Sequence, residues 1–201
     1  MEVSVMISKF AVVETENMGH NVTVGEFAII RGNAIIGENV RIGTGSIIHP
    51  NVVVESNTLI GSYCILGEPT ASFYDDPEHH EFRKTIIGKN SLVRSNTIIY
   101  EDVVVGKNFQ TGHRVTIREE TRIGEHCRIG TLCDLQGKLI VGNYVNLHSH
   151  VQLNQLSYIE DFVWLYHYVV LTNDPYPPMG KLRGVTVRKY AQIAARAIIM
   201  P

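Results

Sequence analysis

Two histidines and one aspartate carry side chains that could move a proton or hold a charged group. An imidazole has a pKa near neutrality, so His148 and His113 could each accept a proton or orient a polar reactant. The carboxylate of Asp134 could hold a cationic group or a hydroxyl. We predict these three as the catalytic residues, His148 first and His113 second. The plainer interpretation is that all three are solvated surface residues.

The elements that would position these side chains follow a repeat of six residues. In two runs an aliphatic residue recurs at every sixth position, with Thr111 as the exception. Glycine often comes next, and a mostly small or β-branched residue stands four positions later. The recurring positions are Met18, Val24, Ile30, Ile36, Ile42, Ile48, Val54, Ile60 and Leu66, then Ile87, Val93, Ile99, Val105, Thr111, Ile117, Ile123, Ile129, Leu135, Val141, Leu147, Leu153, Ile159, Leu165 and Leu171.

A period of six fits neither an α-helix nor a lone strand. It fits a short strand and a tight turn, repeated on three sides of a prism. The large and the small residue point inward, and Gly or Asn takes turn positions that need positive φ. One strand cannot bury its face alone, so the coils stack. We predict an all-β chain that forms one parallel β-helix domain over residues 1–201.

The repeat of Leu/Ile/Val, Gly/Ala/Glu/Asp, two variable residues, Ser/Thr/Ala/Val and one variable residue resembles that of the hexapeptide-repeat family. The resemblance covers about residues 18–66, 87–171 and 187–201. It implies left-handed winding, which periodicity alone does not fix. Cys64, Cys127 and Cys133 all fall on the inward small-residue position, so we interpret them as core residues.

Two segments leave the six-residue frame, at about 67–86 and 172–186. Both are rich in turn formers and charged residues, so we expect loop excursions. With three hexads in a coil, positions 18 residues apart share an edge. Both excursions therefore leave from one edge, and long loops on a rigid scaffold often carry function.

The same spacing stacks polar side chains at another turn. His148 and Tyr166 fall in one column, and His113 and His167 fall in the next. His113 and His148 are two coils apart, so roughly 10 Å separates their levels. They could flank one substrate but could not easily share a metal ion, and we expect no metal. We also expect the histidines and the excursions to border a shared cleft.

Within the family, sugar O-acetyltransferases carry an Asn in one coil and a basic His-Pro four hexads later. Here His148 stands at the Asn position, and the later segment around Asn173 has no His. The stretches FQTGHRVTIREETRIG (109–124), GTLCDLQG (130–137) and VVLTNDPYPP (169–178) instead resemble the branch that N-acylates nucleotide-linked amino sugars. This resemblance implies direct attack of a sugar amine on an acetyl-CoA or short acyl-CoA thioester, with no metal.

The resemblance also implies binding residues. Candidates for the acceptor are Glu119, Glu120, Asn154, Tyr166, Trp164, Asn173 and Asp174. Candidates for coenzyme A, on the last coils, are Arg188, Lys189, Ala194, Ala195 and Arg196. Family members form trimers with sites between subunits. Outward aliphatic residues in the early coils agree with a homotrimer, because an exposed apolar patch needs a partner.

The bulk composition excludes several other functions. A formal charge of −2 gives no general attraction to nucleic acid or to anionic membranes. No apolar run is long enough to span a bilayer, and the first residues lack the order of a secretory signal. Three cysteines without framework spacing suit a reducing cytoplasm. We expect a cytoplasmic protein.

Three other functions remain open. The runner-up is an O-acetyltransferase acting on a sugar or an antibiotic. A γ-class carbonic anhydrase uses the same fold, but it needs two histidines five residues apart, and His148 and His150 are two apart. The third is a structural β-helix subunit without catalytic activity.

Overall fold

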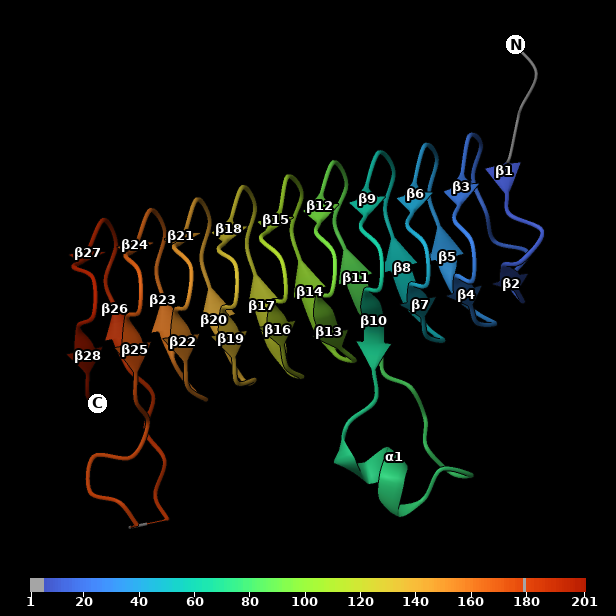
Figure 1. Cartoon of the computed structure of the whole chain (residues 1–201). Helices are drawn as coiled ribbons and strands as arrows, with labels where there is room; N and C mark the ends of the chain where they lie inside the picture. The colour runs from blue at the N-terminus through green and yellow to red at the C-terminus, as the bar shows by residue number, and fades with distance from the viewer. Residues whose placement is uncertain (1–5, 179) are drawn as a thin grey trace.

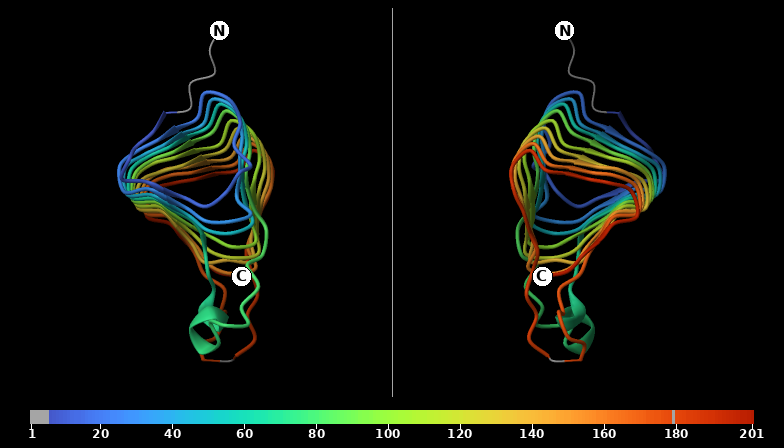
Figure 2. Two further views of the ribbon diagram at one scale, coloured as in Figure 1. Left: turned by 90° about the vertical axis from the view of Figure 1, so that its right-hand side faces the viewer. Right: turned by 90° about the vertical axis from the view of Figure 1, so that its left-hand side faces the viewer.

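The computed structural model describes residues 6–178 and 180–201, which form a left-handed parallel β-helix of triangular cross-section (Figures 1 and 2). The prediction of the fold class is confirmed. The predicted domain, 1–201, includes residues 1–5 and 179, which lie outside the described residues. No helix in the described part is long and apolar enough to cross a membrane.

Three parallel sheets, here named A, B and C, form the sides of the prism. Sheet A consists of β1 (Met6–Ile7), β3 (Thr23–Val24), β6 (Arg41–Ile42), β9 (Leu59–Ile60), β12 (Leu92–Val93), β15 (Gln110–Thr111), β18 (Arg128–Ile129), β21 (Asn146–Leu147), β24 (Trp164–Leu165) and β27 (Gln192–Ile193). Sheet B consists of β2 (Val12–Val13), β4 (Ile29–Ile30), β7 (Ile47–Ile48), β10 (Ile65–Glu68), β13 (Ile98–Tyr100), β16 (Thr116–Ile117), β19 (Asp134–Leu135), β22 (Gln152–Leu153), β25 (Val170–Leu171) and β28 (Ile198–Ile199). Sheet C consists of β5 (Ile35–Ile36), β8 (Val52–Val54), β11 (Thr85–Ile87), β14 (Val103–Val105), β17 (Thr121–Ile123), β20 (Ile140–Val141), β23 (Tyr158–Ile159) and β26 (Thr186–Val187). We name each corner by the sheets it joins, in chain order: A/B, B/C and C/A.

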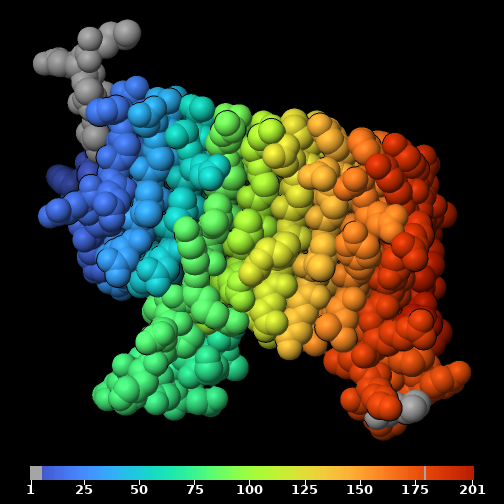
Figure 3. All heavy atoms as spheres, turned by 180° about the vertical axis from the view of Figure 1, so that it is seen from behind, coloured from blue at the N-terminus to red at the C-terminus, as the bar shows by residue number. Residues whose placement is uncertain are grey.

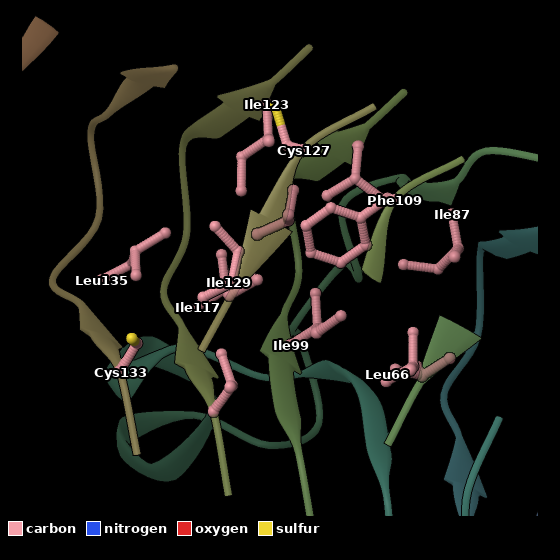
Figure 4. Packing of buried hydrophobic residues seen from close by; sticks show 14 of the residues in the cluster. Leu66, Ile87, Ile99, Phe109, Ile117, Ile123, Cys127, Ile129, Cys133 and Leu135 are labelled. Carbon is pink, nitrogen blue, oxygen red and sulfur yellow. The ribbon is translucent and has the colours of Figure 1, made fainter. Parts of the chain in front are cut away.

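The inside of the prism is filled as the repeat predicts. In sheet B, Ile117 pairs with Leu135 and Leu135 with Leu153, so the inward residues stack at 18-residue steps. All three cysteines are buried and unpaired in this core, and burial raises the pKa of Cys127 and of Cys133 to about 11. Phe109 occupies a small-residue position but is fully buried among the aliphatic side chains (Figure 4).

The turns depend on asparagine and glycine for different reasons. Many corner positions with positive φ are asparagines, such as Asn57 at 59° and Asn90 at 58°. Gly45 and Gly137 hold positive-φ turn positions as predicted, but most glycines that follow the recurring aliphatic residues, such as Gly37, do not have positive φ. They are needed because the next coil lies directly against them: a Cβ on Gly37 would sit 2.6 Å from the backbone nitrogen of Ser56.

Both excursions leave from the B/C corner, as predicted, and project from the same edge of the prism (Figures 1 and 2). The first is shorter than predicted at both ends, because β10 extends to Glu68 and β11 begins at Thr85; it also contains a short helix, α1 (Ala71–Asp75). The second ends where β26 begins, at Thr186. In the space-filling view the two excursions are separate lobes along that edge (Figure 3).

The first excursion is fixed to the helix by one buried carboxylate. Glu101 is fully buried and accepts hydrogen bonds from the backbone nitrogen of Thr70 (3.1 Å), the Thr70 hydroxyl (2.9 Å) and the backbone nitrogen of Arg83 (2.8 Å). The His80 Nε2 atom lies 3.2 Å from the same carboxylate. Burial acts to raise the pKa of Glu101, but these hydrogen bonds hold it below its ordinary value.

Candidate active site

The A/B corner carries the histidines of the predicted site. The backbone nitrogen of His148 donates to the Leu165 carbonyl of the next coil at 2.9 Å, and the Cys133 thiol donates to the His148 carbonyl at 3.0 Å. A Cβ on Gly130, in the preceding coil, would collide with the His148 backbone, so glycine there lets the two coils touch. The backbone under His148 is therefore held on both sides.

The His148 imidazole lies in a group of rings. Its centroid is 5.2 Å from the Tyr166 ring, with the two planes 8° apart, and 4.4 Å from the His167 ring. The Trp164 ring stacks 5.8 Å away. Partial burial lowers the pKa of His148, and the neighbouring His167 lowers it further, because both effects disfavour the charged imidazole. The lowered pKa favours the neutral imidazole, which is the form that can accept a proton.

His113 lies two coils before His148 on the same corner, so the predicted spacing is confirmed. Its backbone nitrogen donates to the Thr131 hydroxyl at 3.2 Å, and the Thr131 carbonyl accepts from the His150 backbone nitrogen at 2.9 Å. One coil, that of Thr131, therefore separates the two histidines. The His113 side chain is exposed, and its role stays a prediction.

Asp134 lies beside this corner on the outer face of sheet B. Its strand, β19, pairs with β16 and β22, so Thr116 and Gln152 flank it along the helix axis. The Gln136 amide donates a hydrogen bond to its carboxylate. The side chain is half-buried and faces outward, as the alternation of the strand predicts.

Five of the acceptor candidates lie at the B/C corner and not with the histidines. Glu119 is ion-paired with Arg118 at 2.9 Å, and Glu120 lies 3.9 Å from the Lys138 ammonium. Asn154 accepts from the Gln152 amide at 3.2 Å, the Asn173 carbonyl accepts from the Arg183 backbone, and Asp174 accepts from the Tyr176 backbone.

Tyr166 and Trp164, by contrast, lie with His148. Within one chain the histidines and the excursions therefore border different corners, so the expected shared cleft is not formed by a single chain.

The candidates for coenzyme A are divided between two corners. Arg188 and Lys189 lie at the C/A corner, where Arg188 pairs with Glu160 at 2.7 Å and Lys189 with Asp161 at 3.6 Å. Ala194, Ala195 and Arg196 lie at the A/B corner, and the Arg196 backbone nitrogen donates to the His167 carbonyl at 2.9 Å.

Sequence reasoning missed a pair of adjoining cavities on the outer face of sheet A. Their volumes are about 450 and 250 Å³, and Gln110 and Arg128 line both. Arg94 lines the smaller one, and Tyr144 lines the larger. The signal was present in the sequence, because the outward strand positions of sheet A become polar at Gln110, Arg128 and Asn146. Among the described residues, no group of three or more His, Cys, Asp or Glu could hold a metal ion.

Comparisons with known proteins address the fold. The family model of the GMPPB C-terminal domain matches residues 30–122, and no curated protein matches the chain. LpxA, a UDP-N-acetylglucosamine acyltransferase of Bacteroides fragilis, superposes with a TM-score of 0.75 at 21% identity, over 84% of this chain and 68% of that chain. The chain shares the left-handed β-helix fold of these acyltransferases.

Two further solved structures agree. The UDP-N-acetylglucosamine O-acyltransferase (LpxA) of Moraxella catarrhalis gives a TM-score of 0.55 at 19% identity, over 84% of this chain and 67% of that one. The UDP-N-acetylglucosamine acyltransferase of Arabidopsis gives 0.56 at 15% identity, over 94% and 69%. The resemblance to hexapeptide-repeat acyltransferases is thus confirmed at the level of the fold.

Proposed function

We propose that this protein is an acyl-CoA-dependent acyltransferase whose acceptor is the amine of a nucleotide-linked amino sugar. The observation that carries the proposal is the His148 imidazole, held among Tyr166, Trp164 and His167 on a rigid corner of the β-helix. The fold supports the reaction class, because the solved structures that resemble it are named as acyltransferases of a nucleotide sugar.

The reaction is a direct transfer. The amine nitrogen attacks the thioester carbonyl, the new C–N bond forms, and the C–S bond breaks as the thiolate leaves. The amine proton passes to His148, which is able to accept it because its lowered pKa keeps the ring neutral, and then to the departing thiolate. The thioester supplies the acyl group. Holding the amine against it accounts for much of the expected rate, through proximity.

The neighbouring polar groups position the acceptor. His113 lies two coils away along the same corner and contacts the sugar at a distance from the reacting nitrogen. Asp134 faces outward on the adjoining sheet and holds the amine or a sugar hydroxyl. The acceptor-side roles of Glu119, Glu120, Asn154, Asn173 and Asp174 require a neighbouring subunit, because these residues lie at the B/C corner.

The acyl donor fits the A/B corner better than the C/A corner. Ala194 and Ala195 are small and exposed beside the His167 coil, so a pantetheine chain has room to approach the backbone. Arg196 adjoins them and can meet a phosphate. Arg188 and Lys189 already have carboxylate partners, so they are weaker candidates for phosphate contact.

The outer face of sheet C supports the proposed homotrimer. Apolar side chains point outward from it in strands β5, β8, β11, β14 and β20, with Arg122 of β17 between the last two, and Ile35 and Ile140 are 46% and 56% exposed. Exposed aliphatic side chains such as these are stabilised when a second subunit covers them. We place the active site between subunits. We place the enzyme in the cytoplasm, which agrees with three unpaired cysteines.

The test is an acyl-transfer assay on the purified protein. Acetyl-CoA is combined with a panel of nucleotide-linked amino sugars and of the matching hydroxy sugars, and the release of free thiol is measured. We expect turnover with at least one amine acceptor. Turnover of hydroxyl acceptors alone would overturn N-acylation in favour of O-acylation, which the name of the Moraxella catarrhalis protein keeps as the second candidate.

A structural subunit would behave differently. It would show no turnover with any acceptor and no rise in melting temperature with coenzyme A, whereas a ligand that binds the native state raises it. Metal analysis of the purified protein tests the carbonic anhydrase alternative.

A further inference from the structure

The two adjoining cavities form a trough along the outer face of sheet A. Asn108, Gln110, His126, Arg128, Tyr144 and Asn146 line the larger cavity. The smaller cavity continues toward the A/B corner, and Arg94, Thr131 and Ser149 supply its charged and hydroxyl groups. Arg128 and Gln110 belong to both cavities, so Arg128 borders the place where the two cavities meet.

The charges that line the trough favour the binding of an anion. None of the residues lining either cavity is an aspartate or a glutamate, although the whole chain carries a formal charge of −2. Within residues 6–178 and 180–201, neither Arg94 nor Arg128 forms an ion pair, whereas Arg118 and Arg122 pair with Glu119 and Asp102.

Thr111 helps to place Arg94 at the end of the trough. It is the one polar residue in the series of inward aliphatic positions, and it is buried. Its hydroxyl accepts a hydrogen bond from the Arg94 backbone nitrogen at 2.8 Å. The exception in the repeat therefore lies at the trough, where it fixes the backbone that carries one of the two guanidiniums.

We propose that this trough binds the nucleoside diphosphate part of the acceptor, with the diphosphate on Arg128 and Arg94. The inference rests on the proposed function and adds to it the location of the nucleotide and the two arginines that bind it. Guanidinium groups donate two parallel hydrogen bonds to phosphate oxygens, and the hydroxyls of Thr131 and Ser149 can donate to the same group. The backbones of the two arginines are two coils apart, which is about 10 Å.

The base is recognised through its edges. The rings of His126, Tyr144 and Phe162 stack on one another at 4.7 and 5.0 Å, so both faces of Tyr144 are covered and its ring meets the trough with its edge. The carboxamides of Asn108, Gln110 and Asn146 lie beside them and offer donors and acceptors. This lining suits hydrogen bonds to a heterocyclic base and leaves little apolar area for an acyl chain.

The direction of the trough agrees with the position of His148. Leu147 and Ser149 line the smaller cavity, and His148 lies between them in the chain. A nucleotide whose diphosphate lies on Arg128 and Arg94 therefore directs its sugar to the corner where the imidazole is.

The test measures binding of UDP, TDP, GDP, CDP and ADP to the full chain by isothermal titration calorimetry. We expect at least one diphosphate to bind, its parent nucleoside to bind far more weakly, and the affinity to fall with salt. Arg128→Gln should weaken binding by about ten- to a hundredfold, and Arg128→Lys should restore part of the loss. Arg94→Gln should weaken it as well.

Arg41→Gln is the matched control. Arg41 holds the same outward position on sheet A, in β6, and likewise has no ion pair within the described residues, but it lies two coils before Arg94 and four before Arg128 and lines neither cavity. It should leave the affinity unchanged. Absence of binding by all five diphosphates, or equal affinity in the Arg128→Gln and Arg41→Gln proteins, would overturn the inference. Unchanged circular dichroism verifies that each variant is folded.

The two proposals fail separately. Diphosphate binding that depends on Arg128, without any acyl transfer, would refute the enzymatic activity and support nucleotide binding in the trough. Acyl transfer with a KM for the nucleotide sugar that Arg128→Gln leaves unchanged would support the activity and refute nucleotide binding in the trough.

Discussion

The early coils, residues 18–66, and the later coils, residues 87–171, are alike on the inside and different on the outside. Ile48 in the early part and Leu135 in the later part both point inward from sheet B and are fully buried. The stacking between coils is the same, with parallel pairing at 18-residue steps in both parts. Nothing in the core distinguishes a part that could catalyse from a part that could not.

The C/A corner shows how the outsides diverge. From the early coils into the start of the later ones, Asn39 donates to Asn57 at 3.0 Å and Asn57 to Asn90 at 3.2 Å, and asparagine tolerates positive φ. From His126 onward the same positions hold a stack of aromatic rings, with Tyr144 at a φ of 56°. A tyrosine in that conformation costs about 1–2 kcal/mol, so the backbone does not favour it. Backbone preference alone therefore does not explain the change.

The largest expected effect comes from removing the His148 imidazole in the later coils. His148→Ala should lower kcat by about a hundred- to ten-thousandfold, because a general base typically contributes that much. The measurement is the rate of thiol release at saturating substrates. The melting temperature should barely change, since the side chain lies on an outer corner.

His20→Ala in the early coils is the matched control for this substitution. Its side chain is exposed, whereas that of His148 is half-buried, and it stacks on no ring among the described residues. It should leave kcat unchanged. An equal loss of kcat in both variants would mean that His148 has no catalytic role, and the comparison between the early and the later coils would fail.

A substitution in the core should not distinguish the two parts. Ile48→Ala and Leu135→Ala should each lower the free energy of unfolding by about 2–5 kcal/mol, because each leaves a cavity in a closely packed interior. Chemical denaturation followed by circular dichroism measures both. A loss confined to one of them would show that the coils are not equivalent inside.

The fold was predictable because it is specified by inward residues whose period is visible in the sequence. The predicted aliphatic positions from Val24 onward are buried, and both excursions leave from the predicted corner. What could not be predicted depends on contacts between coils. The recurring glycines are required by the backbone of the next coil, as at Gly37, and α1 lies in a segment whose anchor, Glu101, is distant in sequence.

The candidate site was predictable only in part. The 18-residue spacing correctly grouped His148 with Tyr166 and placed His113 two coils away. It did not reveal that Arg128 forms no ion pair with any described residue, because pairing depends on which charged side chains lie nearby on adjacent coils and faces. Arg122, six residues earlier, finds Asp102 on the preceding coil, whereas Arg128 lies on a sheet whose neighbouring strands carry Gln110 and Asn146.

The smallest expected effect is a displacement of the pH profile. His148 acts when neutral, so kcat/KM should be constant above its pKa and should fall as the pH drops through it. Partial burial and then His167 hold that pKa below the ordinary value of 6.5, so the midpoint of the fall should lie below that pH. His167→Gln removes the smaller of the two causes, so the acid limb should move to higher pH and still lie below the ordinary value.

His150→Asn is the control for this displacement, because His150 stacks on Tyr168 at the same corner and does not contribute to the His148 pKa. Asparagine also accepts the positive φ of 61° at that position. The acid limb should stay in place in this variant, and the plateau should be equal in all three proteins. Two results would assign the titrating group to another residue: an acid limb that His167→Gln does not move, or an acid limb that lies above the ordinary histidine value. Either result would mean that the His148 imidazole is not what distinguishes the later coils from the early ones.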